Sequence, residues 1–137
     1  MIKTKLQNLY NLNQSKNWQD FIIMKFKASI AYDVNKIIES IVKEVEGIEK
    51  IRNDLIKKLG TEITKENLEE FKKTFSEVVI GNFLIDNPKS KEEFSKEMTE
   101  LFSKDVVINH NQLSRNDLGD NIVSPFFFND LGFLFEE

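Results

Sequence analysis

The stretch that decides the fold is residues 27–59, KASIAYDVNKIIESIVKEVEGIEKIRNDLIKKL. Its apolar residues recur at steps of three and four, which places them along one face of an α-helix. They are Ile30, Val34, Ile37, Ile41, Val45, Ile48, Ile51, Leu55 and Leu59. Charged residues fill the opposite face, and two lysines followed by Gly60 are typical of a helix C-terminus. The pattern predicts one helix of about 33 residues, roughly 50 Å long.

A helix of this length needs a second element to cover its apolar face. Residues 64–80 follow a short loop around residues 60–63 and carry apolar side chains at helical spacing. These are Leu68, Phe71, Phe75, Val78, Val79 and Ile80. We therefore predict that the two segments form a long antiparallel helical hairpin.

Shorter elements are predicted on both sides of this hairpin. The spacing of apolar residues indicates short helices over residues 2–13 and 16–26. After a break at Asn87-Pro88, a capping box that opens at Ser90 indicates a further helix that runs to Phe102.

The last third of the chain contains the one segment that is typical of a strand, residues 105–109. It needs a partner, which would be another short extended piece, such as residues 113–114 or 122–123, or another chain. Ser124-Pro125 then predicts the start of a helix that ends at Phe135. The expected fold is mainly α, with short flanking helices and at most one or two short strands near the C-terminal third, in a single domain spanning residues 1–137.

Composition excludes several classes of chemistry. The chain has no cysteine, so it has no disulfide, thiolate metal site or thiol nucleophile. The net charge is −4, but residues 1–37 carry six basic and two acidic side chains, whereas residues 105–137 carry one basic and six acidic. No apolar stretch approaches the ~18–20 residues that span a bilayer, and no signal-peptide core is present, so cytoplasmic residence is expected.

Catalytic and cofactor motifs are not found in the sequence. The glycines are too far apart for a phosphate-binding loop. The only histidine, His110, is interpreted as a solvated loop residue rather than a general base. Asp117 and Asp120 resemble a fragment of a calcium loop without its central glycine and terminal glutamate. We expect no enzyme activity, no cofactor and no metal.

The C-terminal segment is unusually apolar. Five of the twelve phenylalanines fall within ten residues, and their angles would cover the whole circumference of a helix. Such a helix is either wedged between the other helices or docks a partner or second copy with part of its surface. The candidate partner-binding residues are Phe126, Phe127, Phe128, Leu131, Phe133, Leu134 and Phe135.

Three segments resemble a family of small proteins. Residues 52–60 (RNDLIKKLG) end the long helix, residues 94–97 (FSKE) lead to the strand, and residues 122–125 (IVSP) open the last helix. In these features the chain, over roughly residues 30–137, resembles small bacteriophage and prophage proteins of low-GC Gram-positive hosts, most of unknown function. The resemblance implies a phage origin and supplies no catalytic residues.

The leading hypothesis is a non-enzymatic phage protein that acts through protein–protein contacts. It would be a virion or assembly component, or an inhibitor of a host defence complex such as an anti-CRISPR, working in the host cytoplasm or in the virion. The partner would be another protein or a second copy of the chain. The alternative is a small nucleic-acid-binding module that uses the basic N-terminal region. Its residues would be Lys3, Lys5, Lys16, Lys25 and Lys27 beside Tyr10 and Trp18.

Overall fold

The computed structural model describes residues 1–137, of which about 58% are helical. The prediction of a mainly α fold with one long helix is therefore confirmed. The chain forms two compact units. We call Met1–Gly47 together with Leu101–Glu137 the terminal unit, and Ile48–Glu100 the central unit.

The helix α3 spans Ala28–Leu59, as the apolar periodicity predicts, and it runs from the terminal unit into the central unit. Its buried side chains repeat every three or four residues and are Val34, Ile37, Ile41, Val45 and Ile48. The helix stops before Gly60, whose N–H donates to the carbonyl of Ile56 at 2.8 Å. A Cβ added at Gly60 would collide with the backbone oxygens of Ile56 and Leu84, so close backbone approach requires glycine here.

The predicted second arm of the hairpin, residues 64–80, is wrong. Only α4, Leu68–Lys72, is helical in that stretch. The β-branched run at residues 78–80 disfavours helix, and Gly81 then adopts a φ of 94° that turns the chain back. The turn is closed by Ile63, which accepts from the Gly81 N–H and donates to the Asn82 carbonyl.

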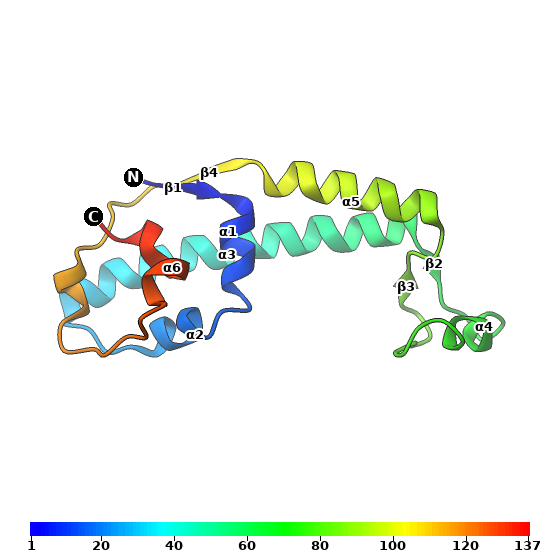
Figure 1. The fold of residues 1–137 in the computed structure, drawn as a ribbon, viewed down its shortest axis with the longest axis horizontal. Helices are drawn as coiled ribbons and strands as arrows, with labels where there is room; N and C mark the ends of the chain where they lie inside the picture. The colour runs from blue at the N-terminus through cyan, green and yellow to red at the C-terminus, as the bar shows by residue number, and fades with distance from the viewer. The chain divides into compact units, whose positions relative to one another are not determined.

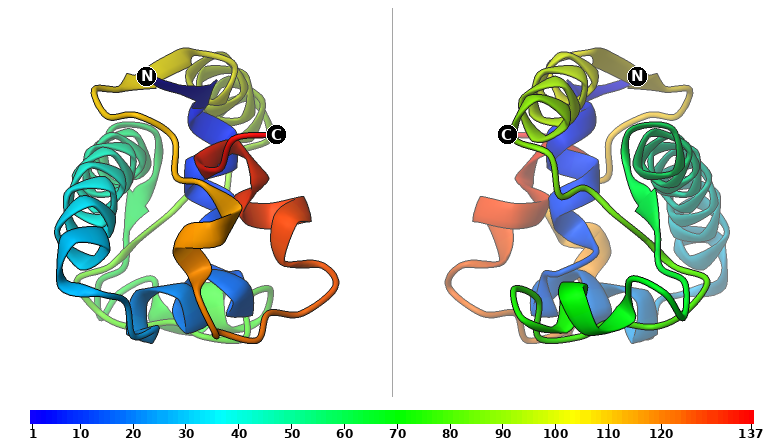
Figure 2. Two further views of the ribbon diagram at one scale, coloured as in Figure 1. Left: turned by 90° about the vertical axis from the view of Figure 1, so that its left-hand side faces the viewer. Right: turned by 90° about the vertical axis from the view of Figure 1, so that its right-hand side faces the viewer.

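The second long helix that contributes to the central unit is instead α5, Pro88–Phe102, which runs in the direction opposite to α3 (Figures 1 and 2). A short antiparallel pair, β2 (Thr61–Glu62) with β3 (Phe83–Leu84), also belongs to this unit. The helix α5 begins two residues before the predicted start at Ser90. Asn87 caps it, accepting from the Lys89 N–H at 2.8 Å, and Pro88 occupies the first helical position.

In the terminal unit, the predicted strand is confirmed as β4, Asp105–Ile108, but its predicted partners are wrong. It pairs antiparallel with β1, Ile2–Lys5, so the helix predicted over residues 2–13 is wrong in its first four residues. Ile2 lies opposite Ile108 and both are buried, whereas the outward-facing Lys5 and Asp105 form an ion pair at 2.6 Å. The helix α1 then covers only Leu6–Leu12.

The terminal unit also contains α2, Lys16–Ile23, and the C-terminal segment (Figure 1). The predicted continuous helix up to Phe135 is wrong. The structure has η1 at Arg115–Leu118, α6 at Phe127–Leu131 and η2 at Gly132–Leu134, after which Phe135 is extended and pairs with Leu113. Consecutive aromatic residues lose side-chain freedom in a helix, and Gly132 is a poor helix former, so the helix is short.

Candidate functional site

The C-terminal aromatic residues gather around Phe21 of α2, which is fully buried. The ring centroid of Phe21 lies 6.1 Å from that of Phe127 and 6.2 Å from that of Phe135, in edge-on geometry. Trp18 and Phe26 complete the cluster at 5.9 Å each. These ring contacts make the C-terminal segment part of the core of the terminal unit.

The seven candidate partner-binding residues fall into three groups. Four are buried and available only to the core: Phe127, Leu131, Leu134 and Phe135. Phe128 and Phe133 are half-buried, and the guanidinium of Arg115 covers the ring of Phe128 at 4.1 Å. Phe126 alone is exposed, with 67% of its surface accessible. The structure therefore leaves one of the seven fully available for contact.

Sequence reasoning missed further exposed apolar residues, which lie on α2 and on the segment before α6, two parts of the chain that pack against each other. Ile122 is 97% exposed, and Ile23 at the end of α2 is 79% exposed. The amide of Asn121 donates to the Lys25 carbonyl at 2.9 Å, which holds the segment before α6 against the chain that leaves α2 (Figure 1). We name Ile22, Ile23, Ile122 and Phe126 the α2–α6 surface. Ile23 lies outside the helical face that carries Trp18 and Phe21, so its exposure follows from the sequence pattern. Ile22 is four residues after Trp18 and is predicted to share the buried face, but it is 45% exposed.

Asp130 joins α2 to α6. Its carboxylate accepts from the Ser15 hydroxyl at 2.7 Å and from the Asn17 amide at 3.0 Å. Ser15 is also the N-cap of α2 and accepts from the Trp18 N–H. The hydrogen bonds from Ser15 and Asn17 lower the pKa of Asp130 below its ordinary value, because they favour the charged carboxylate.

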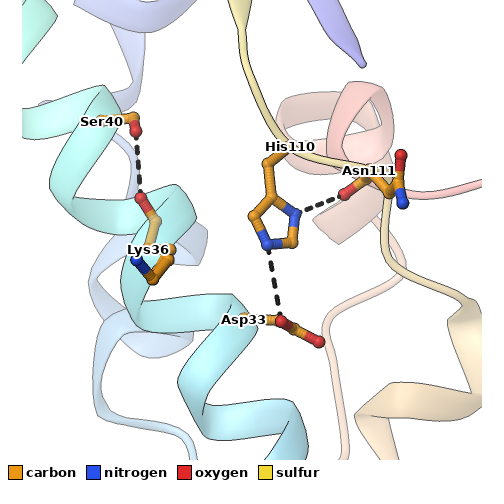
Figure 3. A network of polar contacts seen from close by, with 5 residues as sticks. All are labelled: Asp33, Lys36, Ser40, His110 and Asn111. Atoms are coloured by element: carbon orange, nitrogen blue, oxygen red, sulfur yellow. Dashed lines mark hydrogen bonds and ion pairs between the residues drawn. The ribbon is translucent and has the colours of Figure 1, made fainter.

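His110 lies in the loop after β4 and is less solvated than the sequence suggested, with 21% of its side chain exposed. Its Nδ1 lies 2.8 Å from the Asn111 carbonyl oxygen, and its Nε2 lies 3.5 Å from Asp33 of α3 (Figure 3). Both ring nitrogens therefore face oxygen atoms. The pair ties the loop to α3 and borders a pocket of about 510 Å³ that Met1 and Asp117 also line.

Asp117 has a local structural role. It completes a capping box with Ser114, accepting from the Ser114 N–H at 2.8 Å. No group of three or more His, Asp or Glu side chains is arranged to hold a metal ion.

The residues proposed for nucleic-acid binding are distributed over the terminal unit. The five lysines are exposed, and Lys25 and Lys27 line a pocket of about 500 Å³ at the start of α3. Trp18 is buried and Tyr10 packs on Phe102 at 5.1 Å. Trp18 is thus not available to stack on a base.

No helix in the structure combines the length and the apolar character needed to cross a bilayer. Comparison with protein-family models, curated protein sequences and solved structures finds no significant match.

Proposed function

We propose that this chain is a non-enzymatic phage protein that acts by binding another protein through the α2–α6 surface. The observation that carries the proposal is the exposure of Ile23, Ile122 and Phe126 on two elements, α2 and the segment that leads into α6, which Asn121 and Asp130 join by hydrogen bonds. An apolar patch on adjoining elements is typical of protein interaction sites.

The surrounding charge indicates what the partner presents. The segment that carries Ile122 and Phe126 is acidic, since residues 105–137 contain one basic and six acidic side chains. An apolar partner surface rimmed by lysine or arginine would be complementary, and complementary charge accelerates and orients association.

Two roles fit a contact of this kind. A virion or assembly component would copurify with phage particles, whereas an inhibitor of a host defence complex would bind one host effector. The phage origin rests on the resemblance of residues 52–60, 94–97 and 122–125 described above.

The test compares tagged variants expressed in the infected host, followed by affinity purification and mass spectrometry. Phe126→Asp and Ile122→Asp should lose a specific partner that wild type retains. Val79→Asp is the matched control, because Val79 is 59% exposed and lies in the central unit. The proposal is overturned when both variants keep native circular dichroism and every wild-type partner, or when Val79→Asp loses the same partner.

The alternative function, nucleic-acid binding, is favoured by one observation, the exposed Lys25 and Lys27 beside the pocket at the start of α3. Phosphate contacts would make RNA or DNA affinity fall steeply with salt. Substituting both lysines with Gln should then weaken the affinity and reduce the slope of log affinity against log salt by about 2.

A further inference from the structure

A pocket of about 310 Å³ in the central unit is lined by both aromatic and oxygen-bearing side chains. The aromatic residues are Phe75 and the largely buried Phe71, whose ring centroids lie 6.0 Å apart. The oxygen-bearing residues include Glu70, Asp86, Thr61 and Thr74. Every residue named lies within Ile48–Glu100, so the pocket belongs to one unit.

The two carboxylates have capacity left for a ligand. One oxygen of Asp86 accepts from the Thr61 hydroxyl at 3.1 Å, and the other makes no hydrogen bond within the protein. Glu70 contacts Lys73 at 3.5 Å, but both side chains are more than 70% exposed. Exposed pairs of this kind contribute little free energy, so Lys73 does not prevent Glu70 from binding another cation.

The ammonium group of a lysine in this chain already lies at the pocket. Lys91 of α5 lines it and places its Nζ 6.0 Å from the ring centroid of Phe75. This distance is at the outer limit of a cation–π contact, so the ring face is approached but not covered.

We propose that this pocket binds the guanidinium group of an arginine side chain presented by a partner protein. A guanidinium is planar, stacks on aromatic rings and donates paired hydrogen bonds to carboxylates, whereas an ammonium is a compact, strongly hydrated charge. The combination of phenyl rings with two carboxylates complements that chemistry. The inference rests on the proposed function for the source of the arginine, but the pocket itself is tested without any partner.

The experiment titrates the full-length ¹⁵N-labelled chain with N-acetyl-arginine methylamide and follows the amide signals of the central unit. The matched probe is N-acetyl-citrulline methylamide, which has nearly the same shape and no charge. The arginine probe should produce saturating shifts around the pocket with millimolar affinity, and the citrulline probe should bind at least about 5-fold more weakly.

Variants then separate this site from general charge attraction. Glu70→Gln and Phe75→Leu should each weaken binding about 2- to 5-fold, whereas Lys91→Gln should strengthen it by removing the competing cation. Glu69→Gln is the control for Glu70→Gln, because Glu69 is on the same helix, contacts Lys72 and does not line the pocket. If Phe75→Leu unfolds the unit, the variants at Glu70 and Lys91 still decide the matter.

Equal affinity for the two probes, weaker binding by Lys91→Gln, or equal effects of Glu69→Gln and Glu70→Gln would overturn the proposal. Arginine binding that persists while Phe126→Asp keeps all its partners would refute the α2–α6 surface and leave the pocket standing. Loss of partners in Phe126→Asp, together with no binding of the arginine probe, would refute the pocket and support the α2–α6 surface.

Discussion

Phe126 and Phe127 are neighbours in the chain, and the structure predicts opposite consequences for their truncation to alanine. Phe127 is 1% exposed and its ring contacts those of Phe21, Phe128 and Phe135 at 6.1, 5.2 and 5.9 Å. Truncating a buried phenylalanine costs about 3–5 kcal/mol, and three edge-on ring contacts place Phe127→Ala in the upper half of that range. Phe126 is 67% exposed, so Phe126→Ala should change the free energy of unfolding by less than about 0.5 kcal/mol.

Thermal unfolding followed by far-ultraviolet circular dichroism measures the difference. For a chain of this size, 1 kcal/mol corresponds to roughly 4 °C, so Phe127→Ala should lower Tm by roughly 15–20 °C and Phe126→Ala by about 2 °C or less. Urea unfolding of the same variants gives the free energies directly. Equal losses of Tm in the two variants, or a larger loss for Phe126→Ala, would refute the assignment of Phe127 to the core and Phe126 to the surface.

Three further predictions test α3 and the link between α2 and α6. Ile41→Asp should lower the free energy of unfolding by more than about 4 kcal/mol, because Ile41 is 1% exposed. Lys43→Asp, on the exposed face of α3, should lower it by less than about 1 kcal/mol. Equal midpoints of urea unfolding for the two variants would contradict the orientation of α3. Gly60→Ala should destabilise the fold by about 1–3 kcal/mol. Gly47→Ala, whose Cβ would meet nothing within 4 Å, should stabilise it by about 0.5–1 kcal/mol. If urea unfolding shows that both variants are destabilised or both are stabilised, the packing described at Gly60 is contradicted. The pKa of Asp130 is lower in the folded state than its ordinary value of 3.8, so the Asp130 contacts stabilise the fold at pH values above 3.8. This contribution is less than about 1 kcal/mol and is lost as the pH falls through the folded-state pKa. Wild type should therefore exceed Asp130→Asn in stability at pH 7 and lose that advantage in acid, and a difference that does not vary with pH would contradict the contacts of Asp130.

Local patterns in the sequence were sufficient for α3 and β4. In α3 the apolar period, the flanking lysines and Gly60 all indicate the same element, so propensity and packing agree. The same periodicity misled at residues 64–80, because Phe71 and Phe75 keep a helical spacing across the end of α4 while the β-branched residues and Gly81 impose a turn. A helical spacing of apolar residues was therefore not sufficient where the residues themselves have low helix propensity.

Long-range pairing was not accessible from the sequence. The partner of β4 is decided by Ile2 opposite Ile108, a contact between residues more than a hundred positions apart. Ile2 also fits the helical spacing of Leu6 and Leu9, so the pattern alone favoured a helix. For the candidate site, the sequence identified the aromatic segment but not which of its faces is covered, since burial of Phe127 and exposure of Phe126 depend on where α2 packs.

The discontinuity of the terminal unit has a consequence for synthesis on the ribosome. The central unit is one uninterrupted stretch, Ile48–Glu100, and all of it leaves the exit tunnel before the segment that completes the terminal unit. Until β4 emerges, Ile2 has no strand to pair with, and closing the chain between them costs about 4 kcal/mol in loop entropy. The nascent chain therefore carries β1 unpaired through most of translation, and the aromatic cluster around Phe21 closes only when Phe135 arrives. Folding of this chain is thus mainly post-translational in its terminal unit, and during that interval the unpaired backbone of β1 is open to a chaperone or to a second nascent copy.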